Sequence, residues 1–89
     1  MPRIRFTQNI QRHVSCPNGE VEGATVAAAL EAYFDGNPRA RGYVLDDRGA
    51  LREHMNVFVD GRQIVDRRAL SDAISAAATI DVFQALSGG

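Results

Sequence analysis

Met55-Asn56-Val57-Phe58-Val59-Asp60-Gly61 is the stretch of the chain that decides its fold. Its β-branched and aromatic residues favour an extended strand, and they alternate along the stretch as they do in strands. Asp60-Gly61 is a strong signal for the two-residue turn of a β-hairpin. The sequence therefore predicts a strand over residues 55–59 that turns back into a second strand over residues 62–64.

Three further runs away from this hairpin are predicted as long strands. Residues 80–86 form an apolar run near the C-terminal end, and residues 3–7 alternate polar and apolar side chains near the N-terminal end. Residues 10–16 are predicted to pair with residues 3–7 as a second hairpin. Pro17-Asn18-Gly19 is expected to end that hairpin, because proline and glycine interrupt regular structure.

One helix is predicted between the two hairpins, over residues 26–35. Thr25 can act as its N-cap, because a threonine hydroxyl accepts a hydrogen bond from a free first-turn amide. Gly36 can supply the C-terminal cap, and Pro38 prevents continuation. The helix has an apolar side at helical spacing, made of Val26, Ala29, Leu30, Tyr33 and Phe34.

Shorter segments complete the expected order of elements. Residues 39–42 are predicted as a loop, residues 43–45 as a short strand, residues 46–49 as a turn, and residues 70–74 as a short helical turn. A single helix must bury its apolar side against one face of the sheet. The 89 residues are therefore expected to form one α+β domain, in which the helix lies across a mixed sheet.

The composition argues against several classes of protein. The formal net charge is −1, so the chain is not expected to bind nucleic acid in general. No apolar run is long enough to span a membrane, and the first residues lack the apolar segment of a signal peptide. Cys16 is the only cysteine, so no intrachain disulfide can form, which favours the reducing cytoplasm. Cys16 is expected to be a small core residue.

Catalytic and metal-binding patterns do not stand out in the sequence. His13 and His54 are isolated, with no carboxylate or cysteine at the spacing of a metal ligand. Asp46-Asp47 has the composition of a solvated turn rather than of an acid–base pair. The chain is therefore expected not to be an enzyme and to bind no metal or cofactor of its own.

The chain ends in Gly88-Gly89, shortly after the last apolar run. Glycine has no Cβ, so its backbone can enter a channel that is too narrow for any other residue. Such a tail can carry a terminal carboxylate into another protein's active site, although a leftover linker or a disordered end would look the same. All ten basic residues are arginine, so no side-chain amine can accept an isopeptide bond.

Phe58 and Phe83 are candidate partner-binding residues. Side chains alternate across a strand, so both rings are expected on the sheet face opposite Val57, Val59 and Val82. If the helix covers the valine face, the rings form an exposed aromatic patch of the kind that anchors interfaces. The alternative is that the phenylalanines are buried and the valines face outward, or that a loop covers the rings.

Residues 51–61 resemble the central strand and turn of the β-grasp sulfur-carrier family, and residues 80–89 resemble its last strand and tail. That family includes the thiamine-pathway carrier, the molybdopterin-synthase small subunit and the carrier of a cysteine-synthesis pathway. Residues 43–46 resemble the cysteine-synthesis type most. The family often has Asp-Gly where this chain has Ala78-Thr79, and proline where it has Gln84-Ala85, which puts the identity of the partner in doubt.

The resemblance implies a ubiquitin-like β-grasp roll with a flexible tail at about residues 87–89. An E1-like enzyme using ATP and magnesium would adenylate the carboxylate of Gly89, and sulfur would then replace AMP to give a thiocarboxylate. Gly88 would give clearance, and Ser87 and Leu86 would anchor the exit of the tail. The sulfur would pass to a downstream sulfur-accepting enzyme, in a cysteine, molybdopterin, thiamine or specialised thio-metabolite pathway.

Two other functions fit the same sequence features. The chain could be a ubiquitin-like modifier that is attached to lysines of target proteins through Gly89. It could also be a β-grasp interaction subunit whose tail fills a partner's site and never reacts, because a fold alone does not fix a function.

Overall fold

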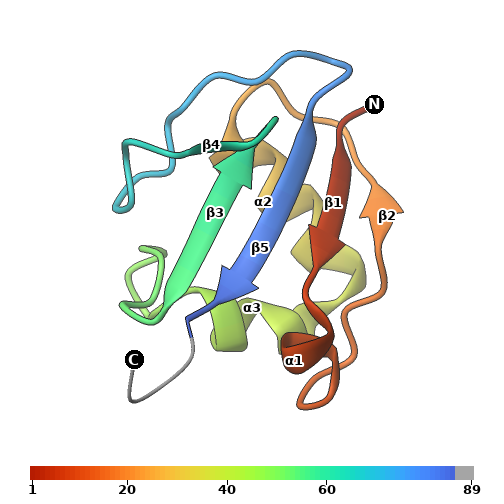
Figure 1. The fold of residues 1–89 in the computed structure, drawn as a ribbon, viewed down its shortest axis with the longest axis vertical. Coiled ribbons are helices and arrows are strands. Elements are labelled where there is room, and N and C mark those ends of the chain that lie inside the picture. The colour runs from red at the N-terminus through yellow and green to blue at the C-terminus, as the bar shows by residue number, and fades with distance from the viewer. Residues whose placement is uncertain (86–89) are drawn as a thin grey trace.

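The structure of the protein is a computed structural model that describes residues 1–85. Five strands form one sheet with the order β2-β1-β5-β3-β4. The helix α2 lies behind the sheet, and α3 and α1 lie at its lower end (Figure 1). The strands are β1 (Arg3–Phe6), β2 (Gly19–Glu20), β3 (Met55–Val59), β4 (Arg62–Gln63) and β5 (Thr79–Gln84). The helices are α1 (Gln8–Gln11), α2 (Val26–Gly36) and α3 (Pro38–Val44).

The sheet is mixed, with β5 at its centre. β5 pairs in parallel with β1, where Ile4 lies opposite Ile80, and antiparallel with β3, where Val57 lies opposite Val82. The pairs β1–β2 and β3–β4 are antiparallel. A mixed sheet with the main helix across one face confirms the predicted α+β roll.

The structure confirms the hairpin from which the prediction began. β3 and β4 are joined by Asp60-Gly61, and both residues have positive φ angles, 51° and 84°. Two positive φ angles are what a type I′ turn requires, and glycine adopts them without steric cost. The turn therefore fixes the register in which Val59 lies opposite Arg62.

The structure also confirms the predicted helix at residues 26–35, which is α2, but the predicted cap is wrong: Gly36 is the last helical residue and Asn37 is the C-cap. The hydroxyl of Thr25 accepts a hydrogen bond from the backbone N–H of Ala28 at 3.1 Å, as expected for an N-cap. All five predicted apolar residues of its inner side are buried. The helix therefore covers one face of the sheet and leaves the other face without a helical layer (Figure 1).

The predicted strand at residues 10–16 is wrong. After β1 the chain turns into the short helix α1, because the N–H groups of Ile10 and Gln11 both donate to the carbonyl of Thr7. Ile10 and Cys16 are buried in the core instead of pairing with β1. β1 instead pairs with Gly19–Glu20, in the segment that was expected to break the hairpin.

The predicted loop at residues 39–42 and strand at residues 43–45 are also wrong. Pro38 does not only end α2; it occupies the first turn of α3, where its missing N–H is not needed. Ala40 and Val44 lie four residues apart on one side of this helix, and both are fully buried. The turn that follows at residues 46–49 is confirmed, since the N–H of Gly49 donates to the carbonyl of Asp46.

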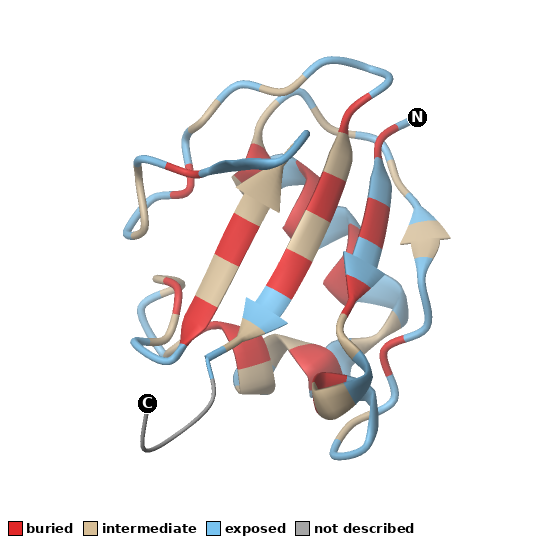
Figure 2. Ribbon diagram, in the orientation of Figure 1, coloured by how far each residue is buried: buried red, intermediate tan, exposed pale blue. Residues whose placement is uncertain are grey.

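The core lies between the sheet and the helices. Buried and more exposed residues alternate along β1, β3 and β5, so each strand has one buried side (Figure 2). Within residues 1–85 no helix is long and apolar enough to cross a lipid bilayer. The largest fully buried side chains, from all parts of the fold, are Ile4, Ile10, Leu30, Leu45, Met55, Leu70, Ile80, Val26, Val44, Val57, Val82 and Cys16.

The short helical turn predicted at residues 70–74 is wrong as well, and an aspartate organises this loop instead. The carboxylate of Asp66 accepts hydrogen bonds from the Ser71 hydroxyl and from the backbone N–H groups of Ala69, Ser71 and Arg68. These contacts, the Ser71 hydroxyl first, lower the pKa of Asp66 to about 2. Leu70 has a positive φ angle of 55° and is buried beneath the loop.

The ionised Asp66 should therefore stabilise the fold in a pH-dependent way. Because folding lowers its pKa, its contribution is fully present above the ordinary aspartate value and is lost as the pH falls through about 2. We expect Asp66→Asn to lower the melting temperature at neutral pH. The difference in melting temperature between this variant and the unmodified protein should become smaller as the pH falls from about 4 to about 2.

Melting curves at several pH values measure this effect, with Asp47→Asn as the control because Asp47 is exposed in another turn. A gap between Asp66→Asn and the unmodified protein that stays constant down to about pH 2 would contradict the assigned role of the carboxylate.

Candidate functional site

The sheet face that the helices leave open carries an aromatic pair. Phe58 of β3 and Phe83 of β5 meet edge to face, with ring centroids 5.3 Å apart and an interplanar angle of 72°. Phe83 keeps 41% of its surface exposed, whereas Val57 and Val82 on the opposite face are fully buried. The structure thus gives both rings the orientation expected from strand alternation. That they bind a partner stays a prediction.

A shallow hollow beside this aromatic pair leads toward the C-terminal end of β5. Its volume is about 370 Å³. Apolar surface predominates in its lining, which is formed by Asn56, Phe58, Gly61, Asp81, Phe83, Gln84 and Ala85. Gln84 and Ala85 are the last described residues of the chain, so the open face continues directly into the start of the tail.

The start of the tail is held by the turn before β3. The backbone N–H of Ala85 donates to the carbonyl of His54 at 2.7 Å. The guanidinium of Arg67 donates to the carbonyls of Arg52 and Met55, at 2.9 and 2.7 Å, on either side of His54. Arg67 therefore fixes the turn to which the end of β5 is attached, with several charge-assisted hydrogen bonds.

Sequence reasoning missed this role of Arg67. An arginine in a loop has the same sequence signature as an ordinary solvated charge, and the carbonyls that it contacts lie 12 to 15 residues away. Arg67 also donates to the side-chain oxygen of Asn56 at 3.0 Å, and Gln63 donates to the same oxygen. These contacts fix the border of the aromatic hollow as well as the turn.

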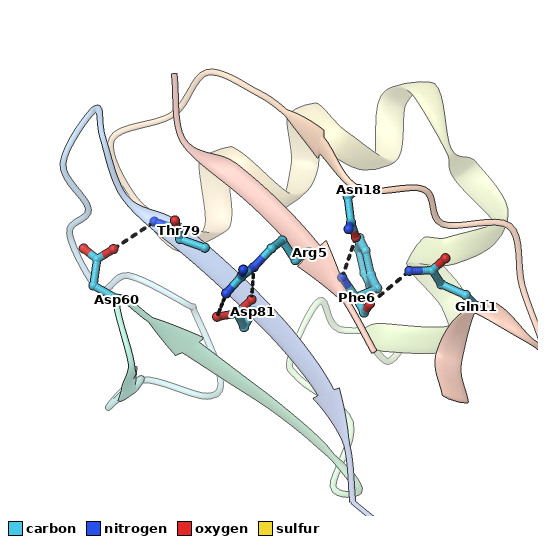
Figure 3. A network of polar contacts seen from close by, with 7 residues as sticks. All are labelled: Arg5, Phe6, Gln11, Asn18, Asp60, Thr79 and Asp81. Atoms are coloured by element: carbon cyan, nitrogen blue, oxygen red, sulfur yellow. Dashed lines mark hydrogen bonds and ion pairs between the residues drawn. The ribbon is translucent and has the colours of Figure 1, made fainter. Parts of the chain in front are cut away.

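Polar contacts cover the other half of the open face, across β1 and β5 (Figure 3). The guanidinium of Arg5 on β1 forms two hydrogen bonds with the carboxylate of Asp81 on β5, at 2.6 and 2.9 Å. At one end of β5 the carboxylate of Asp60 accepts a hydrogen bond from the N–H of Thr79. On the other side of β1, just before β2, the side-chain oxygen of Asn18 accepts a hydrogen bond from the N–H of Phe6.

The predicted tail residues Leu86, Ser87, Gly88 and Gly89 lie outside the described residues. Their assignment as the anchor, the clearance and the reacting group of the tail stays a prediction. The residue before them, Ala85, is attached to the turn that precedes β3, because its N–H donates to the carbonyl of His54.

Of the residues considered as catalytic or metal-binding groups, His13 and Cys16 have packing contacts in the structure. No group of three His, Cys, Asp or Glu side chains in residues 1–85 lies close enough together to hold a metal ion. Cys16 is buried, and burial raises the pKa of its thiol, which disfavours the reactive thiolate. His13 stacks on Tyr43, with ring centroids 6.0 Å apart. Cys16 is thus the small core residue that was predicted.

Comparisons with known proteins place the chain among small ubiquitin-like proteins. No family model matches the sequence. The chain is 35% identical over 71 residues to small archaeal modifier protein 1 of Haloferax volcanii, over 79% of this chain and 77% of that protein.

Solved structures give the same result. The crystal structure of SAMP1 from Haloferax volcanii has a TM-score of 0.78 at 27% identity, covering 99% of this chain and 98% of that one. The fold is also shared with a chain in the Amycolatopsis orientalis BexX/CysO complex, with a TM-score of 0.83 at 16% identity and complete coverage of both chains. Mycobacterium tuberculosis CysO has a TM-score of 0.81 at 15% identity, over 97% of this chain and 100% of that one.

Because Phe83 and Val82 point to opposite faces of the sheet, their truncation should lower the free energy of unfolding by different amounts. Val82→Ala removes fully buried methyl groups and should lower the free energy of unfolding by about 2 kcal/mol. Phe83→Ala loses mainly its contact with Phe58 and should cost only about 1 kcal/mol. Urea denaturation of both variants measures the difference. If Phe83→Ala were the more destabilised variant, the open face would be part of the core.

Proposed function

Because the chain belongs to the ubiquitin-like β-grasp family of small modifier and sulfur-carrier proteins, we propose that it carries sulfur as a thiocarboxylate on Gly89. In this function the chain is a protein cosubstrate and not an enzyme. The observation that carries the proposal is the direct passage from the central strand β5, fixed up to Ala85, into a tail that ends in Gly88-Gly89.

The proposed chemistry takes place on the carboxylate of Gly89 and uses the catalytic groups of a partner. An E1-like enzyme joins the carboxylate to AMP from ATP, with magnesium bound by the enzyme, and pyrophosphate leaves. Hydrosulfide then attacks the acyl carbon, so that the new C–S bond replaces the C–O bond and AMP departs with the electron pair. With a persulfide as the nucleophile, an acyl disulfide forms first, and a second thiol cleaves it to release the thiocarboxylate.

The chain's own residues serve binding and positioning in this proposal. Gly88 enters the partner's channel, where a glycine without a Cβ gives clearance, and Ser87 and Leu86 anchor the exit of the tail. Phe58 and Phe83 dock against the activating enzyme or the downstream sulfur-accepting enzyme. An exposed apolar patch on a small domain is the usual mark of such an interface. We place the reaction in the cytoplasm, where the single cysteine stays reduced.

The second candidate function is protein modification through Gly89. The name of the related Haloferax protein, a small archaeal modifier, favours it. The chain contains no lysine, so it would donate its C-terminus to lysines of other proteins and would not accept another copy on a side chain. Both functions begin with the same adenylation of the tail, so they differ only in the nucleophile that follows.

Intact-mass spectrometry after incubation with the E1-like enzyme of the source organism, ATP and sulfide tests the proposal. We expect a gain of about 16 Da, the mass difference between sulfur and oxygen. Removal of Gly89, or Gly88→Val, should abolish this gain without changing the melting temperature, since a β-branched side chain obstructs a narrow channel. Gly61→Val is not a suitable control because its φ angle is positive. Gly19→Val serves instead, since Gly19 lies on β2, its φ angle is not positive and a Cβ there meets open space.

Three results separate the functions. A mass gain that needs Gly89 supports the sulfur carrier, and conjugates on other proteins in a lysate support the modifier. An unchanged mass, with an enzyme that releases pyrophosphate from ATP when a known carrier is supplied, would overturn the proposed reaction. Normal activation of Gly88→Val would show that clearance at that position is not required.

The docking role of the aromatic pair gives a separate prediction. Phe83→Ala should weaken binding to the same E1-like enzyme by more than about 2 kcal/mol, because central aromatic anchors dominate interfaces. Val65→Ala is the matched control, since Val65 is 90% exposed and does not line the aromatic hollow. Isothermal titration calorimetry measures both. Equal affinities for Phe83→Ala and Val65→Ala would exclude this face from the interface.

A further inference from the structure

The guanidinium of Arg5 is held on the open face by two hydrogen bonds to the carboxylate of Asp81. Its Nε donates to Oδ1 of Asp81 at 2.6 Å and its Nη2 donates to Oδ2 at 2.9 Å (Figure 3). The Arg5 side chain is 51% exposed, whereas that of Asp81 is only 18% exposed. Bidentate pairing of this kind adds geometric specificity to the attraction between the charges. The pair therefore holds a guanidinium in one orientation on the open face without being part of the core.

The orientation leaves one edge of the guanidinium free. A guanidinium has five N–H donors in a rigid plane. Asp81 uses the side edge, formed by Nε and Nη2, and within residues 1–85 the Arg5 side chain donates to no other residue. The terminal edge, with one N–H from Nη1 and one from Nη2, remains available. These two parallel donors match the two oxygens of a second carboxylate.

The surroundings of this free edge belong to the docking face. A hollow of about 200 Å³ lies between Arg5 and Phe83 and is lined also by Phe6, Thr7, Asn18, Asp81 and Val82. Phe83 therefore has the apolar hollow on one side and this more polar hollow on the other.

The charges on this part of the face do not repel an incoming carboxylate. Arg3 shares the exposed side of β1 with Arg5, and Glu20 lies across from Arg3 on β2, at the outer edge. The charge of Asp81 is already matched by Arg5. The other side chains of the face near Phe83, on β3 and β4, are neutral: Asn56, Phe58 and Gln63.

We propose that Arg5 is a specificity-determining residue of the docking face, and that its terminal edge binds an aspartate or glutamate carboxylate of the activating enzyme. This inference rests on the proposed function. When a partner covers the face, the free donors of Arg5 lose water, and a charged donor without an acceptor is costly. A surface that fits Phe83 but presents no acceptor to Arg5 is therefore rejected. Asp81 acts as the positioning residue.

Affinity measurements with the purified E1-like enzyme of the source organism test this proposal. Arg5→Gln should weaken binding by about tenfold to a hundredfold, because a buried charge pair loses one partner. Arg5→Lys should recover only part of the affinity, since lysine keeps the charge and lacks the fork. Arg3→Gln is the matched control, because Arg3 lies on the same side of the same strand and does not line the hollow. It should change affinity by less than about twofold.

A charge exchange separates recognition from a structural role. Arg5→Glu should abolish binding, and replacing one acidic residue of the enzyme's docking surface by lysine should restore it. Arg5→Glu should also lower the melting temperature, because it faces Asp81 on β5, and the enzyme substitution cannot reverse that loss. A merely structural pair would give no such rescue. The salt dependence of the association rate should also be weaker for Arg5→Gln than for the unmodified chain.

The outcomes distinguish this proposal from the proposed function. If Phe83→Ala weakens binding and Arg5→Gln binds as tightly as the unmodified chain, the role of Arg5 is excluded and the sulfur-carrier proposal stands. If no acidic residue of the enzyme gives rescue, the carboxylate partner is excluded. If the enzyme neither binds nor adenylates the unmodified chain, both proposals are overturned.

Discussion

The pairing register of the central strand β5 determines which side chains of the sheet face the core and which face the open side. β5 is hydrogen-bonded on both sides, to β1 in parallel and to β3 in the antiparallel sense. Its inward residues Ile80 and Val82 are fully buried against the helices, whereas Asp81 and Phe83 point to the open face. Because side chains alternate, a slip by one residue would bury a carboxylate and an aromatic ring and expose the core. The register of this one strand therefore sets both the buried side and the exposed side of the sheet.

The features of the candidate site follow from this register. The antiparallel pairing brings Phe58 and Phe83 into contact, and the parallel pairing with β1 brings Arg5 opposite Asp81. The same strand runs on to Ala85, whose N–H is held by the carbonyl of His54. An aromatic anchor, the carboxylate that holds the Arg5 guanidinium and the start of the tail thus lie along one strand. A partner that engages the face is also close to the tail.

The loop after β4 has no regular structure, but it holds in place the turn to which the end of β5 is attached. The carboxylate of Asp66 gathers the N–H groups of the following residues, and Arg67 beside it reaches the carbonyls of the turn before β3. Removing one such interaction would leave buried carbonyls with fewer partners, which is a larger cost than the average worth of a hydrogen bond. The loop is therefore a support for the end of β5 and not a spacer between two strands.

Elements that are marked by residues close together in the chain could be predicted from the sequence. The hairpin of β3 and β4, the capped helix α2 and the last strand could be predicted, because turn residues, a threonine N-cap and alternating side chains act within a few positions. The same alternation placed Phe58 and Phe83 on one face.

Elements that are stabilised by residues far away in the sequence could be assigned only from the tertiary structure. Residues 8–11 and Pro38–Val44 are helical because they cover one end of the core, and their short runs of apolar residues are compatible with loop or strand. The pairing of β1 with Gly19–Glu20, the contact of Arg5 with Asp81, 76 residues away, and the role of Arg67 depend on how the strands meet in space. The physical reason is that packing overrides weak local preferences, and a long-range hydrogen bond has no signature near either residue.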